Sequence, residues 1–409
     1  MKKLLGVLLA MSLIFSVTAC GGATETGSSA NAQGVTDTEI LVANSSAVSG
    51  PFATTGHPLN VGIQAYFDMV NAGGGIDGRT IRFIHTDDEM DPVRARAAFA
   101  SFAEDEQVFA YVGQFGAAPT AAILEDLMAI GMPAVYFATA IGQLYFENAE
   151  TLYEGANIFP IQPLYITEGR VMVVRGIADF DAQSMGIIYT SDEAGMDLFR
   201  GVQAQANEMG IPLTVQQIAP GASDVSAAVT AINSANVDFI VVAAAQATMP
   251  TVVKELAAQN MTVPAITTYI NTVITLAEQV ADDIDGLFQL YASGWLNYEG
   301  ERLANLEAAS EWLGDYSMNG FAHVGWIGAH FFVEGLRRLE GQPVTWESFR
   351  DAMEEAPITI PFGGVVDYAN GARMGTQEMS LFEIDMTSPT GWSEVDGLRS
   401  FDYLLSQVS

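Results

Sequence analysis

Short apolar runs alternate along this chain with segments in which apolar residues recur every three or four positions. The runs predict strands, and the recurrence predicts amphipathic helices, as in Leu59, Ile63, Phe67 and Val70. In the first part of the chain, strands are expected over 39–43, 80–86, 109–113 and 134–137, and helices over 59–70, 92–102 and 120–130. This strict alternation indicates parallel sheets covered by helices.

The alternation starts again after residues 160–163, which read Pro-Ile-Gln-Pro. Strands are expected over 184–189, 213–218, 237–243 and 265–268, and helices over 195–209, 225–234 and 251–259. The pattern therefore predicts two similar α/β halves, and the absence of a short repeat excludes a solenoid. A length of 409 residues allows two or three domains at roughly 150 residues each.

The first twenty residues have the order of a bacterial export signal. Lys2 and Lys3 precede an apolar run over 4–17, which is too short to be a convincing membrane helix. The small residues before Cys20 resemble a lipobox, and this resemblance implies that Cys20 becomes the lipidated first residue of the mature chain. An ordinary signal peptide with a chance cysteine is the alternative, and a thiol nucleophile fits less well. Residues 21–35 are rich in small and polar types and are expected to form a flexible tether.

Composition narrows the class of protein. Hydrophobic residues make up 49% and charged residues 16%, which excludes global disorder. The 49 Asp and Glu against 16 Lys and Arg give a net charge of -33. Such a surface repels phosphates, so we expect no nucleic-acid partner and no basic patch for an anionic membrane. Solubility or a saline habitat explains the acidity without a role in capturing cations.

The sequence offers little for catalysis or metal binding. A single cysteine excludes a disulfide framework and a multi-cysteine metal site, and no histidine has a partner at metal-ligand spacing. Asp87, Glu89 and Asp91 alternate like the start of a calcium loop, but Pro92 and Ala98 stand where such a loop needs Gly and Glu. No P-loop and no G-x-S-x-G elbow is present. A chance pair of carboxylates stays open.

Three stretches occur together in one order. Ser-Gly-Pro at 49–51 precedes the first helix, Asn-Ala-Gly-Gly-Gly-Ile-Asp-Gly-Arg at 71–79 follows it, and Asp87-Asp88 then precedes Asp91-Pro92. Near the end, residues 361–371 look like a closing strand and turn. With these motifs, essentially the whole mature chain resembles the branched-chain amino-acid-type solute-binding proteins of ABC importers.

The resemblance implies the type I periplasmic binding protein fold, an α/β fold with two doubly wound parallel-sheet lobes joined by three hinge crossings. The crossings are expected near 160–163, 291–294 and 357–363. The N-terminal lobe would comprise 36–160 plus 295–356, and the C-terminal lobe 161–294 plus 357–409, after a signal peptide at 1–20. The ligand would lie between the lobes at the carboxyl ends of the strands, which agrees with the general rule for open α/β sheets.

The loops that follow the strands should therefore hold the ligand. The loop 49–56 offers glycine backbone amides and a helix start that favour an anion, although a plain structural turn explains it equally well. By resemblance, the contacts would come from ten residues: Ser49, Gln114, Phe115, Ala117, Thr139, Tyr165, Glu193, Gln246, Tyr269 and Asn271. Helix capping by Thr139, and packing by the residues of the second lobe, are the alternatives.

Two departures from the family pattern concern the ligand. Gly116, Ala117 and Ala118 replace hydroxyl residues that hold a carboxylate in relatives that take amino acids. Tyr269 stands near the place where those relatives have a glutamate for the ammonium group. Because an unpaired buried ammonium is costly, the sequence predicts a small carboxylic acid with an apolar or aromatic body, rather than a polar amino acid. Asp192 or Glu193 could still supply the missing partner.

The expected function is that of an exported, monomeric receptor, lipid-anchored at the outer face of the cytoplasmic membrane. It would close on a small-molecule ligand by a hinge motion and deliver it to ABC permease subunits, without cofactor and without chemistry. A ligand-sensing lipoprotein that presents its closed form to a membrane receptor is the alternative. An enzyme in the cleft is a third reading.

Overall fold

The computed structural model describes residues 31–146, 157–298 and 301–408. Cys20, the expected leader and most of the expected tether therefore lie outside the described residues. The first described residues already contact the fold, because Asn31 Oδ1 accepts a hydrogen bond from the backbone of Val344 at 3.1 Å and Ala32 N donates to Val344 O at 2.9 Å. Asn31 and Ala32, which were expected to belong to the tether, therefore contact the fold.

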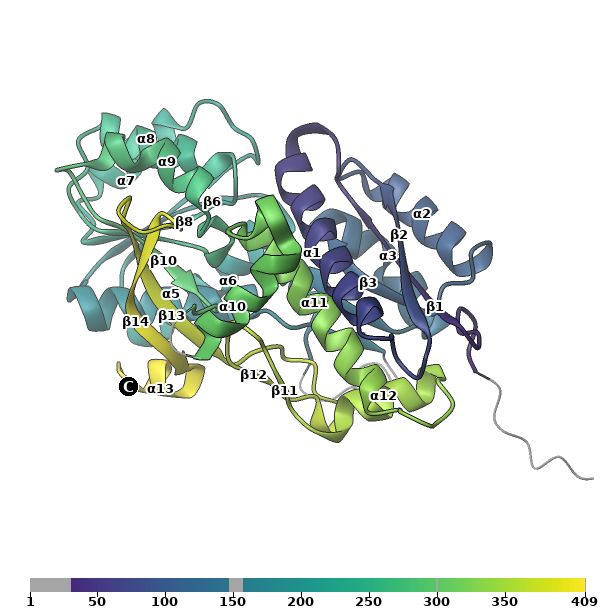
Figure 1. The fold of residues 1–409 in the computed structure, drawn as a ribbon. Helices are drawn as coiled ribbons and strands as arrows, with labels where there is room; N and C mark the ends of the chain where they lie inside the picture. Colours follow the sequence, from purple (N-terminus) through teal and green to yellow (C-terminus); the bar gives the residue numbers. More distant parts are fainter. Residues whose placement is uncertain (1–30, 147–156, 299–300, 409) are drawn as a thin grey trace, which may run out of the picture. The chain divides into compact units, whose positions relative to one another are not determined.

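A five-stranded parallel sheet organises the first half of the chain (Figure 1). Its strands follow the order β2-β1-β3-β4-β5, with bounds β1 (Glu39–Ser46), β2 (Thr80–Asp87), β3 (Ala110–Phe115), β4 (Ala134–Ala138) and β5 (Ile158–Phe159). Helices α1 (Ala53–Ala72) and α11 (Gly320–Arg337) cover one face, and α2 (Pro92–Glu104) and α3 (Ala117–Ile130) cover the other.

A seven-stranded sheet organises the second half. Five parallel strands follow the order β7-β6-β8-β9-β10, with bounds β6 (Met185–Thr190), β7 (Leu213–Ile218), β8 (Phe239–Ala243), β9 (Ala265–Thr267) and β10 (Leu290–Gly294). Two antiparallel strands, β13 (Glu378–Ile384) and β14 (Trp392–Ser400), extend it beyond β10. The five parallel strands repeat the order of the first sheet, which confirms the predicted α/β class.

Both faces of the central strands β6 and β8 are buried, which explains why these strands are mainly apolar. Adjacent residues of β6 point to opposite faces, so Ile187 packs into one apolar cluster and Ile188 into another. Val241 and Val242 of β8 divide in the same way. The covering helices are α5 (Tyr165–Phe180) and α6 (Glu193–Met209) on one face, and α7 (Ser226–Ser234), α8 (Thr248–Ala258) and α9 (Ile274–Ile284) on the other.

Helix α11 packs along α1 although some 250 residues separate them in the chain (Figure 1). Glycines let the two backbones approach closely. A Cβ on Gly62 would lie 1.9 Å from Ala322 O, and one on Gly325 would lie 2.0 Å from Leu59 O. These contacts attach α11 to the first half, together with the shorter α10 (Glu301–Leu313) and α12 (Trp346–Glu355).

The chain passes between the two sheets three times. The passages lie between β5 and β6, between β10 and α11, and between α12 and β13. The third contains a small antiparallel ladder of β11 (Ile358–Thr359) and β12 (Val365–Val366). The chain then ends in α13 (Phe401–Ser406), which packs on α5.

Two details differ from the sequence-based prediction. Helix α1 begins at Ala53, so residues 53–56 of the expected loop form its first turn, and Pro58 lies inside it. Pro58 and the polar residues before it obscure the helical periodicity, and the turn is held by packing of Gly56 on Ala47. The hairpin of β13 and β14 was not predicted, because its half-buried strands alternate with polar residues and lack an unbroken apolar run.

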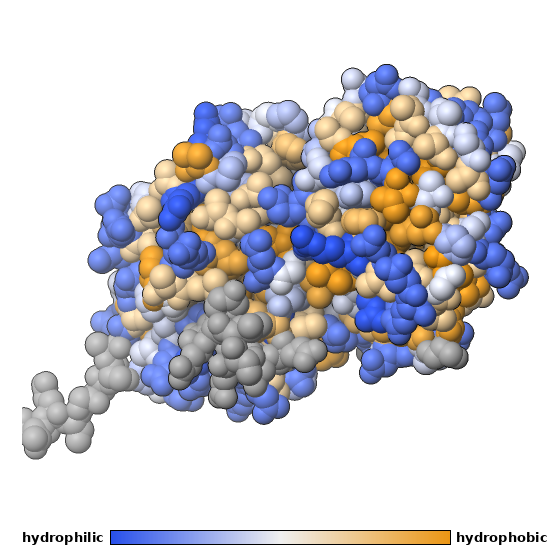
Figure 2. Space-filling view, turned by 180° about the vertical axis from the view of Figure 1, so that it is seen from behind, coloured by the Kyte–Doolittle hydropathy of each residue, from blue (hydrophilic) through white to orange (hydrophobic). Residues whose placement is uncertain are grey.

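Hydrophilic side chains are distributed over the whole face drawn in Figure 2, with hydrophobic residues between them. No helix in the described part of the chain is long and apolar enough to cross a membrane.

Candidate functional site

Nine of the ten residues expected to contact a ligand lie in or just beyond the carboxyl-terminal ends of the parallel strands. Strands of order 2-1-3-4-5 have a switch point beside the first strand, and ligands bind there at the carboxyl edge. The residues and the strand that each follows or ends are Ser49 at β1, Gln114, Phe115 and Ala117 at β3, Thr139 at β4, Glu193 at β6, Gln246 at β8, and Tyr269 and Asn271 at β9. Tyr165 differs, because it begins α5 after the first passage between the sheets.

The side chain of Gln114 forms hydrogen bonds within the first half of the chain. Its side chain is 1% exposed, and its Oε1 accepts hydrogen bonds from Ser45 N at 3.3 Å and Ser45 Oγ at 3.1 Å. Its Nε2 donates to Phe115 O at 3.3 Å. Gln114 therefore joins the ends of β1 and β3, and its amide has little left for a ligand.

At the start of α3, the groups available to a ligand are mainly backbone amides, because the side chains there are small or absent. Gly116 has a φ of 89°, and a Cβ there would lie 2.4 Å from the sulfur of Met90, so the position requires glycine. Phe115 before it is buried, and Ala117 after it is half-buried as the first residue of α3. The backbone conformation at position 116 thus explains why this residue carries no hydroxyl group.

Two aspartates hold the loops beside this edge. Asp87 Oδ1 accepts from Val48 N at 3.1 Å and Glu89 N at 3.0 Å. Partial burial alone would raise the pKa of Asp87, but hydrogen bonds from the Ser49 hydroxyl and from backbone amides outweigh it and lower the pKa. Asp88 is fully buried, and burial raises its pKa. The exposed hydroxyl of Ser49 thus lies beside the carboxylate of Asp87.

Thr139 and Tyr165 come together from the loop after β4 and the start of α5. Thr139 is 1% exposed, and its hydroxyl lies beside the phenol of Tyr165 without the geometry of a full hydrogen bond. The backbone of Tyr165 donates to Ala140 O at 3.2 Å. Burial raises the pKa of the Tyr165 phenol, the Thr139 hydroxyl lowers it, and the carboxyl groups of Glu168 and, more weakly, Asp192 raise it. The hydroxyls of Thr139 and Tyr165 therefore place two polar groups side by side between the two sheets.

Tyr269 stacks on Tyr165. Their ring centroids are 5.8 Å apart with an interplanar angle of 30°, and Trp295 meets Tyr269 edge-on at 6.4 Å. The Tyr269 hydroxyl donates to Pro163 O at 2.8 Å and accepts from Gln162 Nε2 at 3.2 Å. Tyr269 is thus fixed to the first passage, and burial raises its pKa well above the ordinary value.

Gln162 is a residue that the sequence analysis did not select. Its Oε1 accepts from Tyr136 Oη at 2.9 Å, and its backbone carbonyl accepts from Tyr145 Oη at 2.9 Å. Tyr136 adopts a φ of 61°, a left-handed conformation that is unusual for a tyrosine inside a strand. Gln162 therefore connects β4 of the first sheet to Tyr269 of the second. Its position between two prolines was the one signal in the sequence.

Asn271 and Gln246 form a loop-to-loop contact. Asn271 is fully buried, and its Oδ1 accepts from Gln246 N at 2.8 Å. Its Nδ2 donates to Ala244 O at 2.9 Å and to Thr267 Oγ1 at 2.7 Å. The structure thus uses the amide of Asn271 to join the ends of β8 and β9, and the half-buried side chain of Gln246 is the more accessible of the pair.

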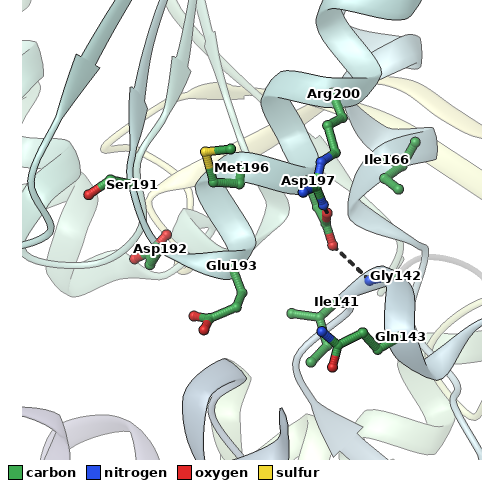
Figure 3. A pocket seen from close by; sticks show the side chains of 10 residues that line it. All are labelled: Ile141, Gly142, Gln143, Ile166, Ser191, Asp192, Glu193, Met196, Asp197 and Arg200. Carbon is green, nitrogen blue, oxygen red and sulfur yellow. Dashed lines mark hydrogen bonds and ion pairs between the residues drawn. The ribbon is translucent and has the colours of Figure 1, made fainter.

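A pocket of about 510 Å³ opens beside these strand ends (Figure 3). One wall belongs to the segment after β4 and the other to the start of α6, and Asp197 Oδ2 accepts from Gly142 N across them at 2.7 Å. The lining residues are Ile141, Gly142, Gln143, Ile166, Ser191, Asp192, Glu193, Met196, Asp197 and Arg200. Of the ten predicted contacts, Glu193 alone lines this pocket.

Glu193 is the acid in this pocket that is available to a ligand. Asp192 caps α6 by accepting from Gly195 N at 2.9 Å, and it also accepts from Thr190 Oγ1 at 2.9 Å. Asp197 pairs with Arg200 at 2.5 Å. Glu193 has no hydrogen bond or ion pair within the described ranges, and its side chain extends outward from the start of α6 (Figure 3).

The described residues contain no group of three or more His, Cys, Asp or Glu arranged to hold a metal ion. His323 and His330 share α11, but each is used in packing. His323 bonds Tyr298 Oη at 2.8 Å and Ser317 O at 2.7 Å, and His330 bonds Tyr66 Oη at 2.9 Å.

Two parallel sheets of the same strand order, with loops that meet at their carboxyl edges, define a two-part binding protein. The model of the periplasmic binding protein family matches residues 39–390, and the chain belongs to this family. The family consists of binding proteins and not of enzymes, and membership implies a location outside the cytoplasm.

Similar solved structures agree on the fold. A fatty acid ABC transporter substrate-binding protein from Thermomonospora curvata has a TM-score of 0.77 at 18% identity, over 93% of this chain and 97% of that one. A branched chain amino acid ABC transporter protein from Thermus thermophilus with bound valine has a TM-score of 0.77 at 15% identity, over 91% and 99%. A solute binding protein from R. palustris in complex with benzoate has a TM-score of 0.73 at 18% identity, over 88% and 96%.

One curated relative is similar in sequence. It is an amino acid binding protein from Pseudomonas aeruginosa, 21% identical over 203 residues, or 49% of this chain. The match spans about half of that relative, 53% of its length.

Proposed function

We propose that this protein is an extracytoplasmic solute-binding lipoprotein, which captures a small carboxylic acid between its two sheets and delivers it to an ABC permease. The observation that carries the proposal is the meeting of Thr139, Tyr165 and Tyr269 at the carboxyl edges of both sheets. The similar structures described above are a fatty acid ABC transporter substrate-binding protein, a protein with bound valine and a protein in complex with benzoate. All three solutes are carboxylic acids, and two of them lack an amino group.

The residues around the proposed site favour an acid with an apolar or aromatic body. The hydroxyls of Thr139 and Tyr165 and the amides at the start of α3 can hold an oxygen anion. The stacked rings of Tyr165 and Tyr269 offer an apolar surface, and burial of apolar surface contributes about 25 cal/mol per Å². The neighbouring pocket of about 510 Å³, which Glu193 lines and these three residues do not, has a volume within the range of small-molecule sites.

A thermal-shift screen tests this proposal. Benzoate, phenylacetate and octanoate should raise the melting temperature more than leucine, isoleucine and valine. A ligand at one hundred times its dissociation constant stabilises the folded state by about 2.7 kcal/mol, which is readily measured. A strong shift with leucine, isoleucine or valine, and none with the acids that lack an amino group, would show that the ligand class is wrong.

The variant Glu193→Gln tests whether the ligand carries a positively charged ammonium group. Glu193 is the available acid of the pocket, so its neutralisation should leave the affinity for an acid without an amino group unchanged or higher. A ligand with an ammonium group would instead lose about tenfold or more in affinity, which corresponds to about 1.4 kcal/mol. The same titration therefore separates the two ligand classes.

The lipid anchor is a separate part of the proposal and rests on Cys20, which lies outside the described residues. Cys20→Ser should abolish metabolic labelling with a radioactive fatty acid and release the protein from the membrane fraction. Retention of the variant in the membrane fraction at the wild-type level would contradict the anchor.

A ligand-sensing role is a second candidate, because the same closed form could be read by a membrane receptor. Uptake of the radiolabelled acid by cells that carry or lack the gene distinguishes the two. Transport predicts that uptake falls when the gene is deleted, and sensing predicts unchanged uptake with an altered transcriptional response.

A further inference from the structure

Glu168 is a buried acid at the centre of the proposed site that ligand capture, as described above, does not use. It lies in the first turn of α5, one turn after Tyr165, and is 0% exposed. Its Oε1 accepts from Tyr269 N at 2.9 Å and its Oε2 from Thr268 Oγ1 at 2.9 Å. The carboxyl therefore fixes the loop after β9 to the start of α5.

This attachment sets the geometry of the two tyrosines. Tyr165 and Glu168 are on the same turn of α5, and the Glu168 carboxyl binds the backbone of Tyr269 itself. The ring of Tyr269 can stack on Tyr165 only if its loop stays at this distance. Ser293, at the end of β10, faces the same carboxyl, so the second passage between the sheets begins beside it as well.

Among the described residues, no cation contributes to the pKa of Glu168. Burial raises its pKa to about 8, and the Tyr269 amide and the hydroxyls of Thr268 and Ser293 offset this only in part. Among the described residues, the titratable groups that feel its charge are the phenols of Tyr165 and Tyr269, from α5 itself and from the loop after β9. No charged side chain of α6 or of the neighbouring strands contributes. Glu168 is therefore mainly neutral at pH 7 and gains a negative charge above pH 8.

We propose that Glu168 is a positioning residue, which holds Tyr269 against Tyr165 for the ligand and makes the affinity for an anionic ligand depend on pH. The inference rests on the proposed function, because it requires the ligand to lie beside this pair of tyrosines. A bound carboxylate and an ionised Glu168 would repel each other across a buried region, so binding favours the neutral acid. Affinity should therefore be full at pH 7 and fall above pH 8.

The first measurement needs no ligand. In protein labelled with ¹³C at glutamate carboxyl groups, one resonance should titrate with a midpoint near pH 8 and be missing from Glu168→Gln. Thr268→Val removes a donor to the charged form and should move that midpoint upward, which provides a second variant if Glu168→Gln does not fold. The inference would be overturned if a resonance with a midpoint near pH 8 persists in Glu168→Gln. It would also be overturned if the midpoint is the same in Thr268→Val as in the wild type.

The second measurement is calorimetric titration with benzoate and octanoate at pH 6, 7, 8 and 9. If the bound acid raises the pKa of Glu168 by about one unit, linkage requires that the affinity fall about fivefold between pH 7 and pH 9. Glu168→Gln should lose this pH dependence, while Glu193→Gln should keep it. Wild-type affinity that is constant from pH 7 to pH 9 would overturn the inference.

The outcomes separate this inference from the proposed function. If neither acid binds at any pH while the glutamate resonance still titrates near pH 8, the proposed function fails and the ligand-positioning role of Glu168 fails with it. If the acids bind and the pH dependence is equal in the wild type and in Glu168→Gln, the proposed function stands and Glu168 has no positioning role.

Discussion

Replacing Tyr269 with alanine should weaken binding of the acid that gives the largest thermal shift by about tenfold to one hundredfold. The ring stacks on Tyr165 at 5.8 Å, and its hydroxyl joins Pro163 and Gln162. Loss of an aromatic pair costs about 0.5–1.5 kcal/mol, and loss of a hydrogen bond about the same. The variant also loses the ring surface on which the proposed ligand packs, and a loss of about 1.4–2.8 kcal/mol of binding free energy corresponds to the expected change in affinity, which calorimetric titration measures directly.

Tyr269→Phe is the matched control for this experiment. It keeps the ring and removes the hydroxyl, so we expect an affinity between those of the wild type and of Tyr269→Ala. The melting temperature of each variant without ligand shows whether the loop after β9 is still folded. Wild-type affinity in a folded Tyr269→Ala protein would remove this residue from the site.

Gly325→Ala should destabilise the protein by about 2 kcal/mol. Its added Cβ would lie 2.0 Å from Leu59 O, so the backbones of α1 and α11 must separate. Overpacking of this kind costs about 1–3 kcal/mol, although alanine is intrinsically the better helix former by about 1 kcal/mol. Denaturation in urea, followed by far-UV circular dichroism, measures the change in the free energy of unfolding.

Gly320→Ala in the same helix provides the control. A Cβ at Gly320 would lie 3.4 Å from a Val273 methyl group, which is an ordinary contact, so the variant should unfold at the wild-type denaturant concentration within a small margin. Equal stability of Gly325→Ala and Gly320→Ala would contradict the close packing of α1 against α11.

The fold was largely predictable because its strands are buried on both faces. Unbroken apolar runs such as the one in β8 identify parallel strands, and the helices between them have ordinary amphipathic spacing. The hairpin of β13 and β14 was missed because its strands pair antiparallel beyond the parallel ones and carry polar residues. The start of α1 was missed because Pro58 interrupts a helix that tertiary packing maintains.

The site was predictable at the level of loops and less so at the level of side chains. The positions of Thr139 and Tyr269 just after predicted strands locate them at the carboxyl edges of the sheets. The sequence does not show which polar side chains are already hydrogen-bonded within the protein. Gln114 and Asn271 are bonded to neighbouring loops, and this becomes visible only in three dimensions. Glu168 and Gln162 lie on a helix and in a passage between the sheets, where no motif marks them.

The central claim is that the acid is captured between the two sheets and that the protein closes on it. Small-angle X-ray scattering on the protein with and without a saturating concentration of the acid found in the thermal-shift screen tests this claim most directly. Closure through the three passages between the sheets predicts a smaller radius of gyration with an unchanged far-UV circular dichroism spectrum. Identical scattering curves at saturation would contradict the claim.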